Sequence, residues 1–180
     1  MNEISLVLAG AAGQGVQTVE ELLVGILKTA GYNVFATKEY MSRVRGGMNS
    51  TEIRISSKKK ASFVKRMDIL MPFHRDALMH LIRRFSDNTR VIADSAVCGE
   101  CSMANPDNLI VLPLSDIAKG VGEAKSVNVV AVGAICALFK IDESIAIDSL
   151  KNRFGGRDAA VLEKNLQAFA KGYETGEELI

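Results

Sequence analysis

The sequence has few of the residues from which most catalytic and metal sites are built, with three cysteines and two histidines among 180 residues. An odd cysteine count, in a chain that begins without the positive and apolar regions of a secretory signal, does not favour a disulfide framework. The most apolar segment of the later chain, residues 127–139, is shorter than the roughly 20 residues that a membrane span needs. We therefore expect a soluble, cytoplasmic protein.

An excess of charge of one sign is also missing. The 22 lysines and arginines nearly balance the 21 aspartates and glutamates, which leaves a formal net charge of +1. The composition therefore predicts binding neither to nucleic acid nor to a membrane surface. With 48% hydrophobic residues the chain is long enough for one buried core, and we expect a single domain over residues 1–180.

Hydrolase, metalloprotease and nucleotide-hydrolase motifs are absent, since the sequence contains no G-x-S-x-G, H-E-x-x-H or G-x-x-x-x-G-K-[ST]. His74 and His80 are too far apart to share a helix face at i+3 or i+4, which favours roles on a helix surface. Cys98 and Cys101 have the C-x-x-C spacing of redox dithiols and of half a zinc or iron–sulfur site. They lie in a predicted loop and the chain cannot supply four cysteine ligands, so an unligated pair is favoured. We predict neither catalytic nor metal-ligating residues on this chain.

The order of apolar patterns predicts an α/β fold. An apolar run at residues 4–8, helical spacing from Val16 to Ala30 and a second apolar run at 33–37 form a β-α-β unit. Further strands are expected near residues 52–56, 67–71, 91–93 and 109–112, and helices over 75–85, 115–118, 127–139, 144–154 and 159–171. Strand 52–56 alternates polar and apolar residues, as half-buried strands do. The whole predicts a Rossmann-like layered domain with a mostly parallel sheet, helices on both faces and a helical C-terminal third.

A glycine-rich turn, residues 10–16 (GAAGQGV), connects the first predicted strand to the first predicted helix. Glycines take positive φ and expose backbone N–H groups, and the helix N-terminus carries partial positive charge, so such a turn suits a phosphate or pyrophosphate. The spacing matches only part of the dinucleotide motif G-x-G-x-x-G. A tight connection without a ligand is an equally supported interpretation.

A second loop, residues 40–49, follows the second predicted strand and contains Arg43 and Arg45. In a parallel sheet it would emerge at the same edge as the glycine-rich turn. Its arginines would either bind a phosphate or form salt bridges, and Glu39 is placed to meet a ribose hydroxyl. The predicted cofactor-binding residues are Gly13, Gln14, Gly15, Val16, Arg45, Gly46 and Gly47.

Residues 10–16, together with residues 39–49 (EYMSRVRGGMN) and 53–56 (IRIS), resemble the gamma subunit of 2-oxoacid:ferredoxin oxidoreductases of the pyruvate, 2-oxoglutarate and ketoisovalerate types. Residues 67–70 and 128–133, and Asn165, Ala168 and Gly172, are also similar to that family, so the resemblance runs end to end. The form Y-x-S-x-x-R-G-G-x-N is especially similar to gamma domains fused ahead of an alpha domain. Ala12, Met41 and Met48 differ from the residues common in the family. These differences affect the assignment of the substrate type more than the assignment of the family.

The resemblance implies a complex that oxidatively decarboxylates a 2-oxoacid with coenzyme A, giving acyl-CoA, carbon dioxide and reduced ferredoxin. Thiamine diphosphate would lie between alpha and beta subunits, and the iron–sulfur clusters in other subunits. This chain would be a scaffold, bound to alpha and beta subunits and in some complexes a delta subunit, that contacts coenzyme A through the glycine-rich turn. Ferredoxin would be reached through the complex, and the isolated chain could form a homo-oligomer. Two alternatives remain, a small NAD(P)-dependent oxidoreductase and a purely structural interaction module.

Overall fold

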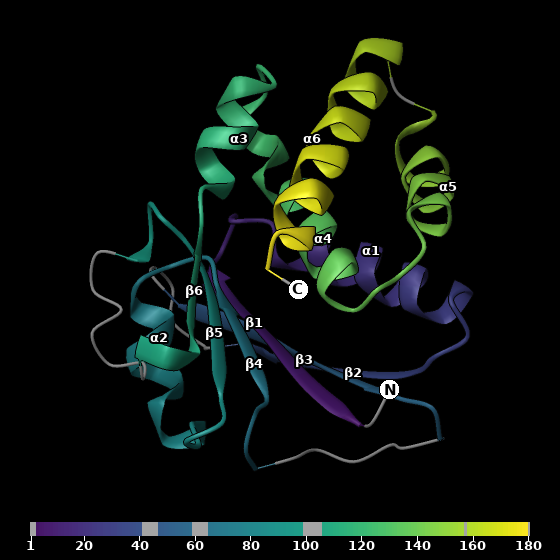
Figure 1. The fold of residues 1–180 in the computed structure, drawn as a ribbon. Coiled ribbons are helices and arrows are strands. Elements are labelled where there is room, and N and C mark those ends of the chain that lie inside the picture. Colours follow the sequence, from purple (N-terminus) through teal and green to yellow (C-terminus); the bar gives the residue numbers. More distant parts are fainter. Residues whose placement is uncertain (1–2, 41–46, 59–64, 99–105, 157, 180) are drawn as a thin grey trace. The chain divides into compact units, whose positions relative to one another are not determined.

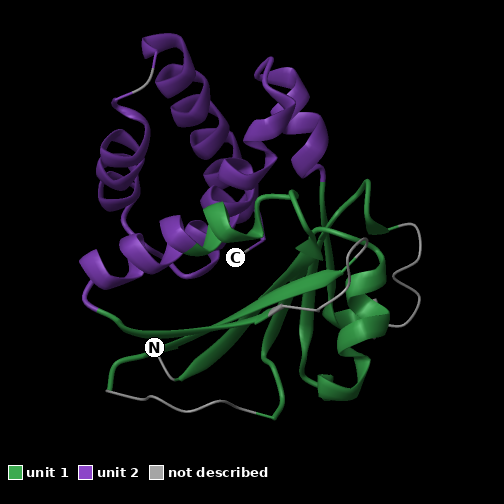
Figure 2. Cartoon of the chain, turned by 180° about the vertical axis from the view of Figure 1, so that it is seen from behind, with its two compact units in different colours: residues 1–20, 32–112 green, residues 21–31, 113–180 purple. Residues whose placement is uncertain are grey.

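The computed structural model describes residues 3–40, 47–58, 65–98, 106–156 and 158–179. The chain divides into two compact units, each made from two separate stretches of sequence (Figure 2). The sheet unit comprises residues 1–20 and 32–112, and the helical unit comprises residues 21–31 and 113–180. Helix α1 (Val16–Thr29) begins in the first unit and ends in the second.

The sheet has six strands in the order β2-β3-β1-β4-β5-β6 (Figure 1). They are β1 (Ile4–Ala11), β2 (Asn33–Tyr40), β3 (Met48–Ser56), β4 (Ile69–Pro72), β5 (Arg90–Asp94) and β6 (Leu109–Leu112), with the short 3-10 helix η3 (Pro106–Asn108) ahead of β6. Strands β1, β4, β5 and β6 pair in parallel, whereas β3 is antiparallel to both β1 and β2. The predicted α/β fold with a mostly parallel sheet is confirmed. The first β-α-β unit is split, because β3 lies between β1 and β2.

One face of the sheet carries an apolar core that includes helix α2 (Asp76–Leu81). Within α2, residues Ala77, Leu78 and Leu81 are buried. The core also contains Val7, Ala9, Met48, Met67, Leu70, Val91 and Ala93. Each fully buried leucine of this kind stabilises the fold by about 1.5–3 kcal/mol. The single helix expected over residues 75–85 is shorter than predicted, since the chain tightens into the 3-10 helix η1 (Ile82–Arg84).

Strand β3 differs from its predicted half-buried state. Glu52 and Arg54 are only 4% and 6% exposed, and β3 is an internal strand that lies between β1 and β2. Glu52 accepts a hydrogen bond of 3.2 Å from the Ser5 hydroxyl and pairs with Arg84 of η1, and Arg54 pairs with Glu3. Charged groups are buried at acceptable cost only when they are paired in this way.

The helical unit contains the end of α1, then α3 (Leu114–Gly120), α4 (Val127–Leu138), α5 (Glu143–Phe154) and α6 (Ala159–Glu177), with the 3-10 turn η4 (Ala124–Ser126) before α4. The helical C-terminal third is therefore confirmed. Asp142 and Asp158 cap α5 and α6 by accepting bonds of 2.8 and 2.9 Å from the backbone N–H groups of Ser144 and Ala160. Within the described residues, no helix combines the length and apolarity that crossing a bilayer requires.

Helices α4 and α6 approach each other at glycines. A Cβ atom placed on Gly172 of α6 would lie 2.1 Å from the Val130 carbonyl oxygen of α4, and one placed on Gly176 would lie 2.6 Å from that of Ala134. The paired positions advance together along both helices, so α4 and α6 run in parallel. Glycine permits this because it brings no side chain between the two backbones.

Candidate functional site

The glycine-rich turn between β1 and α1 is fixed by its own hydrogen bonds. Gly13 and Gly15 have φ values of 89° and 76°, which residues with a Cβ rarely adopt. The Gln14 N–H donates to the Ala11 carbonyl at 3.2 Å, and the Gln14 side-chain oxygen accepts from the Ala11 N–H at 2.7 Å. The Gln14 side chain therefore shapes the turn, while the exposed backbone of Gly13 faces solvent.

Gly10 brings this turn against the segment that follows β4. A Cβ atom on Gly10 would lie 2.9 Å from the Phe73 Cβ and 3.0 Å from both the Gln14 Oε1 and the Val16 Cγ2. The Phe73 N–H also donates to the Ala9 carbonyl at 2.7 Å. Strand β2 follows β1 in the chain and lies on the β3 side of β1 in the sheet. Strand β5 follows β4 and lies on the opposite side, so the direction of strand order reverses between β1 and β4. In α/β proteins, ligands bind at the carboxyl ends of strands at such a reversal of strand order.

The second predicted loop begins and ends at this same edge of the sheet. Met48 pairs with Ala11, and Asn49 pairs with both Gly10 and Tyr40. The end of β2 and the start of β3 therefore lie beside the carboxyl end of β1. Gly47 is buried there. Arg43, Arg45 and Gly46 lie outside the described residues.

Glu39 lies near the end of β2, and its carboxylate accepts a hydrogen bond of 3.4 Å from the Ser50 hydroxyl on β3. It is exposed. The position is at the edge where the sequence predicts a ribose-binding carboxylate, but the contact that the structure records is with the neighbouring strand.

The position of His74 is one that the sequence did not indicate. This residue comes two positions after the end of β4, directly after Phe73 and before α2, and its Nδ1 accepts a hydrogen bond of 3.2 Å from the Asp76 N–H. His80 is exposed on α2, as predicted for a helix-surface histidine. The signal that could have found His74 is its place after a strand of the parallel sheet, since such residues gather at the carboxyl edge.

The two cysteines that the structure describes, Cys98 and Cys136, are free thiols. Cys98 is partly buried and packs against the apolar core of the sheet unit, and its C-x-x-C partner Cys101 lies outside the described residues. Cys136 is buried in α4, where burial raises the pKa of its thiol to about 12. Among the residues that the structure describes, no three or more His, Cys, Asp or Glu side chains are grouped so that they could hold a metal ion.

The edge can therefore present backbone N–H groups at the N-terminus of a 14-residue helix, beside a loop whose sequence contains two arginines. These groups can bind an anion, because the helix dipole and the N–H donors both favour negative charge.

Comparison with known protein families settles which family this fold and edge come from. Residues 5–175 match the family described as pyruvate ferredoxin/flavodoxin oxidoreductase. The chain belongs to this family. The match covers both units of the structure and includes the glycine-rich turn and the second loop.

Relatives within the family are subunits of 2-oxoacid:ferredoxin oxidoreductases. The 2-oxoglutarate synthase subunit KorC of Archaeoglobus fulgidus is 27% identical over 97% of this chain and 88% of its own length. A chain of the 2-oxoglutarate:ferredoxin oxidoreductase from Magnetococcus marinus, solved with 2-oxoglutarate, coenzyme A and succinyl-CoA bound, is 26% identical with a TM-score of 0.86. It covers all of this chain, which in turn spans 32% of that longer chain.

A gamma subunit supplies the third comparison. The gamma subunit of a keto/oxoacid ferredoxin oxidoreductase from Geobacter sulfurreducens shares the fold, with a TM-score of 0.77 and 21% identity over 96% of this chain and 98% of its own. The family resemblance found in the sequence is confirmed by the match over residues 5–175. None of the comparisons shows a cofactor bound by this chain.

Proposed function

We propose that the chain is the gamma subunit of a multisubunit 2-oxoacid:ferredoxin oxidoreductase. The observation that carries the proposal is the near full-length match to KorC, a subunit of 2-oxoglutarate synthase. In the reaction, the 2-oxoacid loses carbon dioxide and its acyl group is transferred to the thiol of coenzyme A. The electrons released reduce ferredoxin. The family match over residues 5–175 supports treating residues 1–180 as one gamma domain, and we propose that the complex is cytoplasmic.

Reconstitution tests this function directly. The alpha and beta subunits are combined with and without this chain, and complex assembly and 2-oxoacid-dependent ferredoxin reduction are measured. We expect both to require this chain. If omitting it leaves assembly and ferredoxin reduction unchanged, the proposed function is wrong. Pyruvate, 2-oxoglutarate and branched-chain 2-oxoacids are compared in the same assay, which identifies the substrate.

We also propose that the glycine-rich turn contacts coenzyme A. The proposed contact residues are Gly13, Gln14, Gly15, Val16, Arg45, Gly46 and Gly47. Support comes from the anion-binding character of a helix N-terminus preceded by glycines with positive φ. Further support is that coenzyme A is bound in the Magnetococcus marinus relative.

Calorimetric titration of the assembled complex with coenzyme A tests the contact. We expect Arg45→Ala to weaken binding by about tenfold to a hundredfold, since one charge-assisted hydrogen bond is worth roughly 1.5–3 kcal/mol. Arg90→Ala is the matched control, because Arg90 is exposed at the amino end of β5, the opposite end from the glycine-rich turn. Equal affinities for wild type and both variants would remove Arg45 from the site.

The turn itself is tested with paired glycine substitutions. Gly13→Ala and Gly31→Ala impose similar backbone strain, because φ is +89° and +88° at the two positions and neither has an atom within 4 Å of the new Cβ. Gly31 follows the other end of α1. We expect Gly13→Ala to weaken coenzyme A binding and Gly31→Ala to leave it unchanged. NADH is titrated in parallel, since saturable NADH binding with coenzyme A inert would favour the alternative oxidoreductase.

A further inference from the structure

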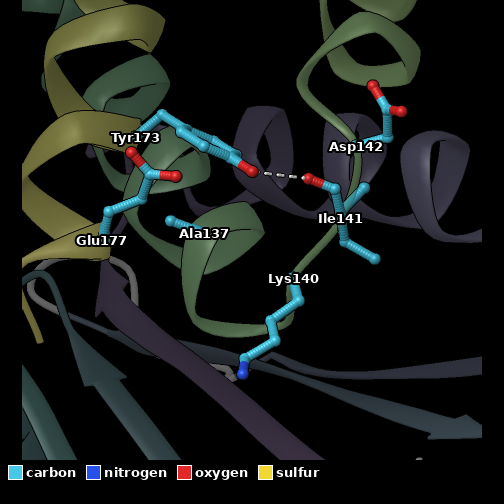
Figure 3. A pocket seen from close by; sticks show the side chains of 6 residues that line it. All are labelled: Ala137, Lys140, Ile141, Asp142, Tyr173 and Glu177. Carbon is cyan, nitrogen blue, oxygen red and sulfur yellow. Dashed lines mark hydrogen bonds between the residues drawn. The ribbon is translucent and has the colours of Figure 1, made fainter. Parts of the chain in front are cut away.

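A pocket of about 500 Å³ lies in the helical unit, at the C-terminal ends of α4 and α6 (Figure 3). Its lining residues are Ala137, Lys140, Ile141, Asp142, Tyr173 and Glu177. Because α4 and α6 run in parallel, the last turns of both helices reach it. The volume is within the range of protein sites that bind small molecules.

The walls of the pocket are held in place by hydrogen bonds. After α4, Lys140 has a φ of 53°, its N–H donates to the Ala137 carbonyl at 2.8 Å, and the Ile141 N–H donates to the Cys136 carbonyl at 2.9 Å. These bonds form the helix-ending motif that usually has glycine at the position of Lys140. The Tyr173 hydroxyl donates to the Ile141 carbonyl at 2.9 Å and so connects α6 to this segment.

Negative charge prevails around the pocket. Two carboxylates, those of Asp142 and Glu177, line it against one ammonium group. In Figure 3 the Lys140 side chain extends away from both carboxylates. The pKa of Tyr173 is raised, first by burial and then by the negative charges of Glu177 and Glu143. The C-terminal ends of both helices add partial negative charge.

Glu177 is available to a partner. Among the residues that the structure describes, its carboxylate has no hydrogen-bond or salt-bridge partner, whereas the Asp142 carboxylate accepts bonds from Ser144. Ala137 and the Tyr173 ring line the pocket on the same side as this carboxylate. An apolar wall next to a carboxylate and an aromatic ring is the environment that a long cationic side chain requires for its methylene stem and its charged head.

We propose that this pocket seats an arginine or lysine side chain of another subunit of the complex. The inference rests on the proposed function, because it requires partner subunits. The charged head would lie near the Glu177 carboxylate and the Tyr173 ring, and the stem against the ring and Ala137. An anionic group is disfavoured there, since Asp142 and Glu177 would both repel it.

Two substitutions that should shift the affinity for the partner subunits in opposite directions test the proposal. The affinity of this chain for the immobilised alpha and beta subunits is measured at low and at high salt. Glu177→Gln should weaken association by about tenfold at low salt, which lies between the effects of exposed and fully buried interface charge pairs. Lys140→Asn should strengthen it several-fold, because it removes a like charge that repels an incoming cation and because asparagine tolerates positive φ. Both effects should shrink at high salt.

Glu178→Gln is the matched control. Glu178 follows Glu177 at the end of α6, is exposed and does not line the pocket, so its substitution should leave the affinity unchanged within about twofold. If Glu177→Gln behaves like Glu178→Gln, or if Glu177→Gln and Lys140→Asn shift the affinity in the same direction, the inference is wrong. If the wild-type chain fails to bind the alpha and beta subunits at all, the proposed function itself is wrong.

Discussion

Replacing Gly172 by alanine tests how tightly α4 and α6 are packed. The new Cβ would lie 2.1 Å from the Val130 carbonyl oxygen and 2.9 Å from its Cα, both of them backbone atoms that cannot rotate away. Ordinary contact begins at 3.4 Å, so the helices must separate by about 1.3 Å at this point. Overpacking of a core costs about 1–3 kcal/mol, and separating the helices also loses dispersion contacts.

The net effect follows by subtracting the better helix propensity of alanine. Alanine in place of a mid-helix glycine gains about 0.5–1 kcal/mol. Taking the overpacking cost near its upper limit, we expect Gly172→Ala to lower the free energy of unfolding by about 2 kcal/mol. The measurement is urea denaturation followed by far-ultraviolet circular dichroism.

Gly25→Ala is the control, because it adds the same methyl group without the contact. Gly25 lies within α1 and is exposed, and a Cβ atom placed on it would have no atom within 4 Å. This substitution should raise the free energy of unfolding by about 0.5–1 kcal/mol. If both substitutions shift the denaturation midpoint in the same direction, the close approach of α4 and α6 at Gly172 is refuted.

Three further predictions concern charge, ionisation and backbone strain. Arg84→Met should lower the free energy of unfolding by about 2–3 kcal/mol, since it removes a guanidinium from the buried Glu52 carboxylate; Arg83→Met, at an exposed neighbouring position, should change it little in the same urea titration. Burial raises the pKa of the Cys136 thiol from 9.0 to about 12, so the unfolded chain loses this proton at a lower pH than the folded chain. Stability should therefore fall between about pH 9 and 12 by up to about 1.4 kcal/mol per pH unit, and a Cys136→Ala variant that retains the full slope would contradict this. Lys140→Gly should raise the melting temperature, because it relieves a positive φ of 53° at a gain of up to about 1 kcal/mol; an unchanged or lower melting temperature would show that Lys140 is not strained.

Much of the fold could be predicted because its signals are local. The apolar run of β1, the start of α1 at Val16 and the apolar α4 are each visible in a short window of sequence. The place of β3 between β1 and β2 was not foreseen, because strand pairing depends on residues distant in sequence. The alternating residues of β3 showed which side chains are polar, but they did not show that Glu52 and Arg54 are buried. The Arg84 partner that allows Glu52 to be buried lies 32 residues away.

The local geometry around the glycine-rich turn was predictable to the same extent. The glycine-rich turn has the positive φ values that its glycines indicated, and it meets the ends of the second loop at one edge of the sheet. The position of His74 at this edge was missed, because it depends on the pairing of β1 with β4, which are far apart in sequence. The α4–α6 pocket has no sequence signature, since the Tyr173 hydroxyl and the Ile141 carbonyl that it binds are 32 positions apart.

The insertion of β3 has a consequence for how the chain folds. β2 and β3 form an antiparallel hairpin, in which bonded residues such as Glu39 and Ser50 are only 11 positions apart. Joining β1 to β4 instead closes a long loop, since Ser5 and Asp68 are 63 positions apart. Loop-closure entropy favours the shorter connection, and local contacts form faster. The hairpin can therefore act as an early template onto which β1 docks, which makes the second loop of the candidate site the tip of an early folding unit.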